Sequence, residues 1–276
     1  MSIQTKAAFA VACSALLAAC GGGGDGGGAP APVAAPNSFT LGTNGTIQEA
    51  RADISRGEDG RIMLTMTEGP MEGTTVLCVD QTMGRCQVVG GPEGTSGEGT
   101  LVQRLAGNYA FVGNFAILQL ENGALVSNNQ LVYGGLPEHA DQTVALPEGQ
   151  VSYTGRFEAG YGLANEEAGL MSGTASLLAD FNAGRISGAF EGATGAGTGV
   201  SASFNNLTID ATNGQFTSTD DTVILFQGVE AGGAIHGAFY GPNADEAAGI
   251  FNFGNDQGGM SGIFLTCQGD TAGCLE

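Results

Sequence analysis

The sequence predicts an all-β protein, an eight-stranded antiparallel β-barrel preceded by a smaller β-rich region. Its composition supports this class, because 49 Gly among 276 residues and 42% hydrophobic residues favour many short strands over long helices. The hydrophobic residues recur with a period of two, which is the period of a strand and not of a helix. Turn sequences such as NAG at 182–184 and TNG at 212–214 separate these alternating stretches.

The N-terminal segment MSIQTKAAFAVACSALLAAC, residues 1–20, has the features of a secretory signal peptide. It carries one early Lys and an apolar stretch at 7–19 that is too short to span a bilayer as a stable helix. The ending LAAC resembles the bacterial lipobox, which implies that Cys20 is acylated and becomes the first mature residue. An ordinary signal peptide with a chance Cys at this position is the alternative.

Residues 21–37 contain the tract GGGGDGGGAPAPVAAP and are expected to be a flexible tether with a reach on the order of 20 Å. Several acyl chains, each giving about 0.8 kcal/mol per buried methylene, make a durable membrane anchor. Lipoproteins with Gly rather than Asp after the acylated Cys usually go to the outer membrane. This resemblance implies a lipid-anchored protein of the outer membrane of a Gram-negative bacterium.

The charge of the chain excludes some partners. It has 28 Asp and Glu against 8 Lys and Arg, a net charge of −20, so neither nucleic acid nor an anionic membrane surface is an electrostatic partner. The single Lys, Lys6, lies in the signal segment, which leaves seven Arg as the cations of the mature chain. An acidic surface adapted to salty surroundings and a ligand with a basic contact patch or a bound cation both stay open.

Four cysteines remain after Cys13 in the signal segment and Cys20. They form two local pairs, Cys78 with Cys86 in CVDQTMGRC and Cys267 with Cys274 in CQGDTAGC. Each pair is predicted to close its own disulfide across a polar turn, contributing roughly 2.5 kcal/mol in the chain-entropy model. Long-range cross-pairing is the alternative. A zinc site needs shorter spacing or nearby His, so no metal is predicted.

The stretch from Asn37 to about Ala106 is less regular, and from there onward strands alternate with turns. About eight strands follow from Val151, which suits a small closed barrel that its own side chains fill. Phe181, Phe190, Phe239 and Phe251 are expected in that interior. The predicted strands are 62–65, 109–120, 130–133, 151–157, 174–181, 186–190, 202–210, 222–227, 232–240, 249–253 and 259–265.

The run GAFYGPNADEAAGIF at 237–251 is predicted to be a strand, an acidic connection and a second strand. Gly241 and Pro242 end the first strand, because Pro cannot donate to the ladder. Residues 243–246 are expected to form one helical turn, with Asn243 as its cap and Asp245 and Glu246 at its positive end.

That run, followed by GGMSGIFLT, resembles the last strands of the β-barrel domain of the transferrin-binding protein B family. The upstream pieces PEGQVSYTGRFEAGY, GTASLLADFNAGRISGAF and SFNNLTIDATNGQF agree in order, and together they cover about residues 130–266. The resemblance implies a self-filled eight-stranded barrel on a lipid anchor, which displays a binding surface to host iron carriers or other macromolecules. Established receptors add a second lobe and a handle domain that carries the transferrin contact. No transferrin-contacting residue can be carried over, which disfavours transferrin itself as the ligand and leaves the ligand-binding residues unassigned.

The sequence contains no catalytic motif. It lacks GxSxG, HExxH and a Walker loop, and its two histidines, His139 and His236, are 97 positions apart. The acidic pairs at 166–167 and 220–221 fit solvated turns, on which adjacent side chains point apart. His236 is a haem ligand only if it lines a barrel mouth, whereas a strand His is more often a surface or packing residue. We therefore predict neither an enzyme nor a cofactor.

These observations predict a signal peptide at 1–20, a tether at 21–37, a small β-rich region at 38–106 and a barrel domain at 107–276. The predicted function is that of a binding lipoprotein of the outer membrane, displayed at the cell surface, which the resemblance links to iron or solute acquisition. Whether the inner or the outer leaflet holds the anchor stays open. The partners of the protein are the membrane, through the lipid anchor, and a protein or solute ligand held by loops or by the N-terminal region. A structural envelope lipoprotein without a dedicated ligand is the alternative.

The lipid anchor is testable at one residue. Replacing Cys20→Ser is expected to leave the protein unprocessed or soluble, because the acyl chains supply the membrane affinity. Fractionation of cells after a high-salt wash measures this. A Cys20→Ser protein that stays firmly in the membrane fraction contradicts lipidation at this residue, and Cys13→Ser is the matched control.

Overall fold

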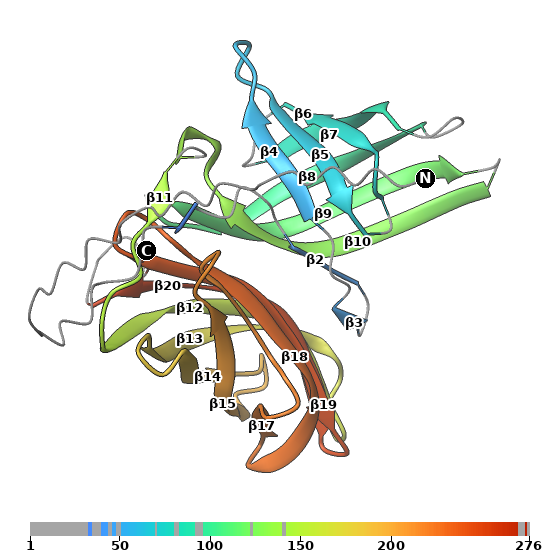
Figure 1. The fold of residues 1–276 in the computed structure, drawn as a ribbon. Coiled ribbons are helices and arrows are strands. Elements are labelled where there is room, and N and C mark those ends of the chain that lie inside the picture. Colours follow the sequence, from blue (N-terminus) through green and yellow to red (C-terminus); the bar gives the residue numbers. More distant parts are fainter. Residues whose placement is uncertain are drawn as a thin grey trace, which may run out of the picture.

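The computed structural model describes residues 33–34, 40–43, 46–47, 51–69, 71–79, 83–91, 96–121, 124–139, 142–269 and 274. The signal segment with Cys20 lies outside these ranges, as does most of the tether. Strands and turns make up nearly all of the described chain, with one 3-10 turn at Pro137–His139. The all-β prediction is therefore confirmed (Figure 1). Within the described ranges no helix has the length and apolarity that crossing a membrane requires.

The C-terminal half of the chain forms a closed antiparallel barrel (Figure 1). Each strand pairs with the next, and the last strand returns to pair with the first over Tyr153–Leu163 and Gly258–Gln268. Two short strands, β16 and β17, share one position between β15 and β18, so nine strands fill eight positions. The strands are β12 (Gln150–Leu163), β13 (Gly169–Asp180), β14 (Arg185–Ala193), β15 (Gly199–Asp210), β16 (Gln215–Thr217), β17 (Val223–Phe226), β18 (Val229–Tyr240), β19 (Glu246–Asn255) and β20 (Gly258–Gln268).

Phenyl rings fill the interior of the barrel. The ring of Phe190 stacks on that of Phe251 with centroids 4.4 Å apart, and Phe157 meets Phe190 edge-on at 5.5 Å. Phe190, Phe239 and Phe251 are fully buried, and Phe181 packs partly buried against the same core. The predicted filling of the interior is thus confirmed, as expected for a barrel of eight strands.

Glycines on the inner wall make room for these rings. A Cβ on Gly173 would lie 2.6 Å from a ring carbon of Phe157, and one on Gly249 would lie 2.6 Å from a ring carbon of Phe264. Real Cβ atoms do not approach other atoms so closely, so large and small residues must alternate around the wall to close the core. This packing explains part of the high glycine content.

The preceding residues form an open antiparallel sheet of nine strands in the order β3-β2-β10-β9-β8-β7-β6-β5-β4. This first sheet curls over a core of its own, which includes Leu64, Leu101, Phe111 and Phe115. Its strands are β2 (Thr40–Thr43), β3 (Thr46–Ile47), β4 (Arg51–Arg56), β5 (Ile62–Glu68), β6 (Thr75–Cys78), β7 (Met83–Gly90), β8 (Ser96–Ala106), β9 (Ala110–Glu121) and β10 (Ala124–Gly135).

The division expected after residue 106 does not coincide with the boundary between the sheets. Strands β8 and β9 pair along their whole length, from Ser96 with Leu120 to Ala106 with Phe111, so the chain cannot change sheet there. The first sheet runs on to Gly135, and the barrel begins at Gln150. Alternation becomes regular near Tyr109, but a period of two says which face a residue occupies and not which sheet its strand joins.

The end of the predicted tether is paired with the body of the protein. Strand β1 (Val33–Ala34) runs antiparallel to β11 (Thr143–Val144), with Val33 opposite Val144. Residues 33–34 are therefore part of a two-stranded sheet, which differs from the flexible tether expected over all of 21–37. Pairing of two residues carries little sequence signal, since a Val-Ala step fits both a Pro/Ala-rich linker and a strand.

The two cysteine pairs lie at different places in the fold. Cys78 and Cys86 stand opposite each other across β6 and β7 and are joined, with their Cα atoms 4.0 Å apart. Cys267, near the end of β20, is joined to Cys274, with a Cα separation of 5.7 Å. Each disulfide closes a short local loop.

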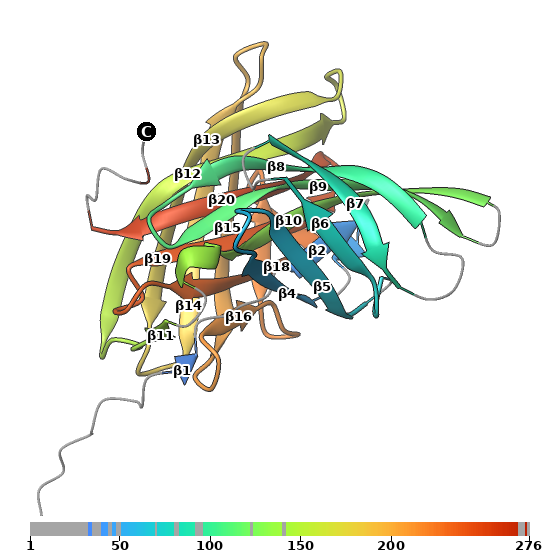
Figure 2. The same cartoon turned by 90° about the horizontal axis from the view of Figure 1, so that it is seen from above.

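The first sheet covers one wall of the barrel. The outer faces of β18, β19 and β20 pack against β9 and β10, and both views show the sheet lying across these strands (Figures 1 and 2). Strand β19 is therefore buried on both faces from Glu246 to Phe251. The buried residues of this interface are Ala110, Val112, Tyr133, Ala238, Tyr240, Ala248, Ile250, Ile263, Leu265, Cys267 and Cys274.

The aromatic core is testable by truncating its central ring. Phe190→Ala is expected to lower the free energy of unfolding by about 3–5 kcal/mol, because it leaves a cavity among at least four other phenyl rings. Denaturant unfolding followed by circular dichroism measures the change. Leu170→Ala is the control, since Leu170 is 82% exposed and its loss is expected to change stability by less than about 0.5 kcal/mol. Equal effects of the two substitutions would contradict the packed interior.

Candidate functional site

The filled barrel leaves no room for a ligand inside, so the candidate sites lie on the outer surface. Three hollows stand out on the described surface. The junction groove, of about 440 Å³, lies between the first sheet and β12, β13 and β20. The outer hollow, of about 690 Å³, lies on the first sheet alone, and the histidine hollow, of about 240 Å³, lies beside His236.

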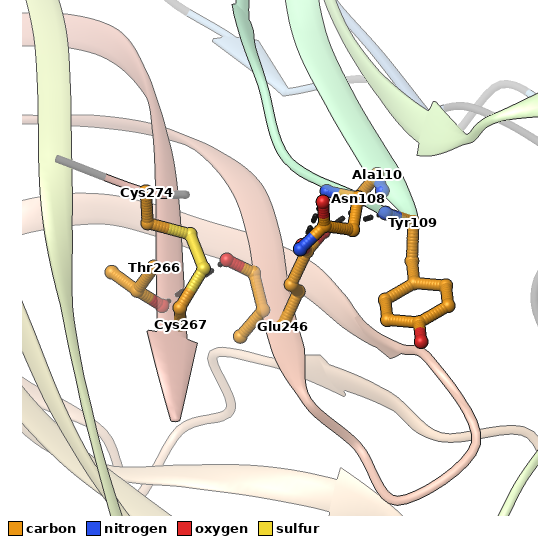
Figure 3. Close-up of a disulfide and its surroundings, with 8 residues drawn as sticks. Asn108, Tyr109, Ala110, Glu246, Thr266, Cys267 and Cys274 are labelled. Carbon is orange, nitrogen blue, oxygen red and sulfur yellow. Dashed lines mark hydrogen bonds between the residues drawn. A yellow bond between two sulfur atoms is a disulfide. The ribbon is translucent and has the colours of Figure 1, made fainter. Parts of the chain in front are cut away.

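One buried carboxylate joins the two sheets between which the junction groove runs. Glu246 at the start of β19 points out of the barrel and accepts three backbone hydrogen bonds from the turn between β8 and β9 (Figure 3). The N–H groups of Asn108, Tyr109 and Ala110 donate at 2.6, 3.0 and 2.9 Å. Three unpaired N–H groups in a buried turn would be costly, so this single side chain satisfies the turn that packs on the barrel.

The surroundings of Glu246 are adapted to it. Burial raises the pKa of its carboxyl, and the three N–H donors act in the opposite direction. A Cβ on Gly107 would overlap the carboxylate, so only glycine fits at that position of the turn. The sequence signal for this role was an acid directly before a stretch that is apolar on both faces, AAGIF.

The connection before Glu246 is not the helical turn expected from the sequence. Ala244 has a positive φ of 56°, and Asn243 does not cap a helix but donates its N–H to the carboxylate of Asp245 at 3.2 Å. Glu246 already belongs to β19. The buried hydroxyl of Tyr153 donates to the Ala244 carbonyl at 2.8 Å, and this contact from inside the barrel favours a left-handed residue over a helical turn.

Glu246 also lies near sulfur. Its carboxylate and the sulfur atoms of Cys267 and Cys274 fall within 4.8 Å of one another (Figure 3). Metals bind the thiolate form of cysteine, and here both sulfur atoms are joined in a disulfide. The arrangement therefore stabilises the junction and does not form a metal site in the oxidised protein.

A bulge directs one arginine into the junction groove. The pairing of β8 with β9 shifts between Gln103 and Leu105, so Arg104 falls out of the alternation. Its guanidinium reaches the barrel and binds Glu158 of β12 at 2.7 and 2.8 Å. Leu170, 82% exposed, borders the same groove. The groove thus combines one ion pair between the sheets with an exposed apolar side chain.

The two histidines have different surroundings and do not form a common site. His236 shares the outer face of β18 with Ala238 and Tyr240, and its Nδ1 is 3.0 Å from the Thr217 hydroxyl. It faces the histidine hollow and not a barrel mouth, so the geometry considered for a haem ligand is absent. The ring of His139 packs on Tyr109 at 5.1 Å. The residues around the histidine hollow are Arg51, Tyr133, Thr208, Asp210, Asn213, Gln215, Phe216, Thr217, Thr219 and His236.

The acidic pairs considered for catalysis lie on turns. Residues 220–221 are exposed in the turn before β17, and residues 166–167 lie in the connection between β12 and β13. Glu166 accepts a hydrogen bond from the Thr198 hydroxyl, which is a structural contact. These positions agree with the solvated turns expected from the sequence.

The contact between Glu246 and the turn at 108–110 is testable by removing the carboxylate that accepts its hydrogen bonds. Glu246→Leu is expected to lower the free energy of unfolding by at least about 2 kcal/mol, because three buried N–H groups lose their acceptor. Thermal or denaturant unfolding measures the loss. Glu191→Leu, on the exposed outer face of β14, is the control and is expected to change stability by less than about 0.5 kcal/mol. An unchanged Glu246→Leu protein would show that the turn does not depend on the carboxylate.

Comparison with known proteins gives one family. The family model described as the C-lobe and N-lobe beta barrels of Tf-binding protein B matches residues 127–267, about half of the chain. This range holds the barrel up to the last residue but one of β20 and most of β10. No curated protein matches the chain.

Several solved structures are similar at low sequence identity. Transferrin-binding protein B of Haemophilus parasuis Hp5 is 18% identical with a TM-score of 0.45, over 83% of this chain and 44% of that chain. The N-lobe domain of lactoferrin-binding protein B of Moraxella bovis is 15% identical with a TM-score of 0.35, over 84% and 99%. The Neisseria meningitidis transferrin-binding protein B is 12% identical with a TM-score of 0.33, over 80% and 52%. This chain spans about half the length of the two transferrin-binding proteins named here.

Proposed function

The chain belongs to the family of transferrin-binding protein B β-barrels, and from that premise we propose that it is a lipid-anchored lipoprotein of the outer membrane that binds a ligand at the cell surface. The observation that carries this proposal is the closed barrel filled with phenyl rings. Such a barrel offers no internal cavity, so recognition has to use its outside or the sheet that it supports. The anchor at Cys20 and the N-terminal tether then hold this body at the membrane.

The family consists of binding proteins rather than enzymes. We extend this binding role to the chain and propose no catalytic or metal site for it. The ligand is a protein or a solute, and its uptake or capture is linked to iron or nutrient acquisition. With a net charge of −20, a partner with net positive charge is attracted at long range, and the association slows as salt rises.

The orientation of the chain decides between a surface receptor and an envelope protein without a ligand. Protease added to intact cells is expected to release or degrade residues 37–276 in the wild type, because a receptor must face outward. Immunoblotting of cells, with a periplasmic protein as the control for intact envelopes, measures this. A domain that resists protease until the cells are lysed would contradict the receptor and favour the structural lipoprotein. Cys20→Ser is the matched variant, since a protein without the acyl chains is not held at the cell surface for the protease to reach.

A further inference from the structure

The outer face of the first sheet is only half covered. Along β9 the side chains of Ala110 and Val112 pack under the barrel. Two positions further on, Asn114 borders the junction groove, and Ala116 and Leu118 line the outer hollow. Because alternate residues share one face of a strand, these five residues lie on a single surface. The barrel covers its first part, and its second part is not covered by the barrel.

The uncovered half is apolar. Leu118 of β9, Val79 after β6 and Met63 of β5 are 44%, 57% and 42% exposed, which makes them three of the eight large apolar side chains that stand out on the described surface. Leu77, opposite Met63 in the pairing of β5 with β6, extends the patch between them. An apolar patch that continues from an existing interface indicates a surface that another protein covers.

The charge of this half differs from the charge of the rest of the molecule. Two of the seven arginines, Arg61 and Arg85, line the outer hollow with one carboxylate, Glu98. Arg61 is bound by Asp59, whereas Arg85 has no acidic partner among the residues that the structure describes. A cation beside apolar side chains favours a partner that brings both apolar contact and a carboxylate.

A sheet face suits a protein partner better than a small molecule. The hollow is lined mainly by residues of four adjacent strands, β6, β7, β8 and β9, and it is open on the side away from the sheet. A small ligand there would keep much of its surface in water, while small-molecule sites bury most of their ligand. A flat protein surface covers such a face, as the barrel wall already covers the other half.

We propose that the docking face, defined by Met63, Leu77, Val79, Arg85, Ala116 and Leu118, is the place where this protein binds its protein partner, through an apolar contact centred on a carboxylate of the partner at Arg85. The inference rests on the proposed binding function and adds the site and the local chemistry of the ligand. It also refines the expectation of a basic contact patch. A partner with net positive charge is attracted from a distance, and a carboxylate within its apolar contact pairs with Arg85.

The chemistry of the docking face is tested first with a defined probe, the apolar anion 8-anilinonaphthalene-1-sulfonate, on the purified full chain. Arg85→Glu and Leu118→Glu are expected to weaken binding of the dye at least about fivefold, the order expected for losing a charge partner or an apolar anchor. Val229→Glu is the matched control, since Val229 is 46% exposed and lies on the barrel, and it is expected to leave binding within about twofold. Equal binding by all variants overturns the proposed chemistry of this face.

The occupant is tested by cross-linking on intact cells that carry the full chain. A photo-reactive residue at position 79 or 118 is expected to give one discrete adduct with a second protein, and the same residue at 229 is expected to give none. Arg85→Glu is expected to reduce the adduct about tenfold and Arg85→Lys to restore most of it, with unchanged thermal unfolding of both variants. Mass spectrometry of the joined peptide supports the proposal only if the partner's peptide carries Asp or Glu among apolar residues.

Other outcomes overturn the proposal in distinguishable ways. An adduct of twice the mass of the chain shows a second copy on this face. Cells that bind a partner but give adducts from 229 and none from 79 or 118 keep the binding function and move the site to the barrel. Cells that are resistant to protease and give no adduct from any of the three positions contradict both the binding function and the docking face.

Discussion

The burial of the barrel wall β18–β20 under β9 and β10 is the constraint on which the rest of the structure depends. A closed barrel with a filled interior needs no cover, yet here three neighbouring strands are apolar on the outside as well. Water would be in contact with Ala248, Ile250 and Ile263 if the first sheet were absent. The first sheet is therefore not an appendage, because it completes the second layer of a core that the barrel alone leaves exposed.

Glu246 shows how a polar chain segment is accommodated in that layer. Any turn that packs on an apolar wall exposes backbone N–H groups to it, and they need an acceptor. The turn at 107–110 finds one in a carboxylate that the barrel itself supplies. This contact fixes where β8 and β9 meet the barrel, and the bulge that aims Arg104 at Glu158 fixes a second point on the same strand pair. These two polar contacts thus fix the position of the first sheet on the barrel wall. The apolar contacts in the same interface are non-directional and would not fix it.

The sequence predicted the barrel well because its information is local. Alternation in stretches such as 151–157 and 174–181 shows which side chains face inward. The first stretch lies within β12, and β13 contains the second except for its last residue. The neighbours of β9 and β10 were not predictable in the same way, since both strands alternate like barrel strands and yet pair with the first sheet. Pairing is decided by contacts between residues far apart in the chain, and a period of two contains no information about them.

The docking face was beyond the reach of sequence reasoning for a related reason. Arg85 and Leu118 come from two separate strands and Val79 directly follows a third, and each looks ordinary in its own segment. These residues form one exposed patch only in the folded protein, where the barrel covers one end of the face and leaves the other end exposed. The net charge sums over the whole chain and therefore predicts a basic partner. The electrostatic energy of one contact depends instead on the few charged groups within a Debye length of about 8–10 Å. An acidic protein can therefore attract a basic partner from a distance and still receive a carboxylate of that partner at an apolar, arginine-bearing face.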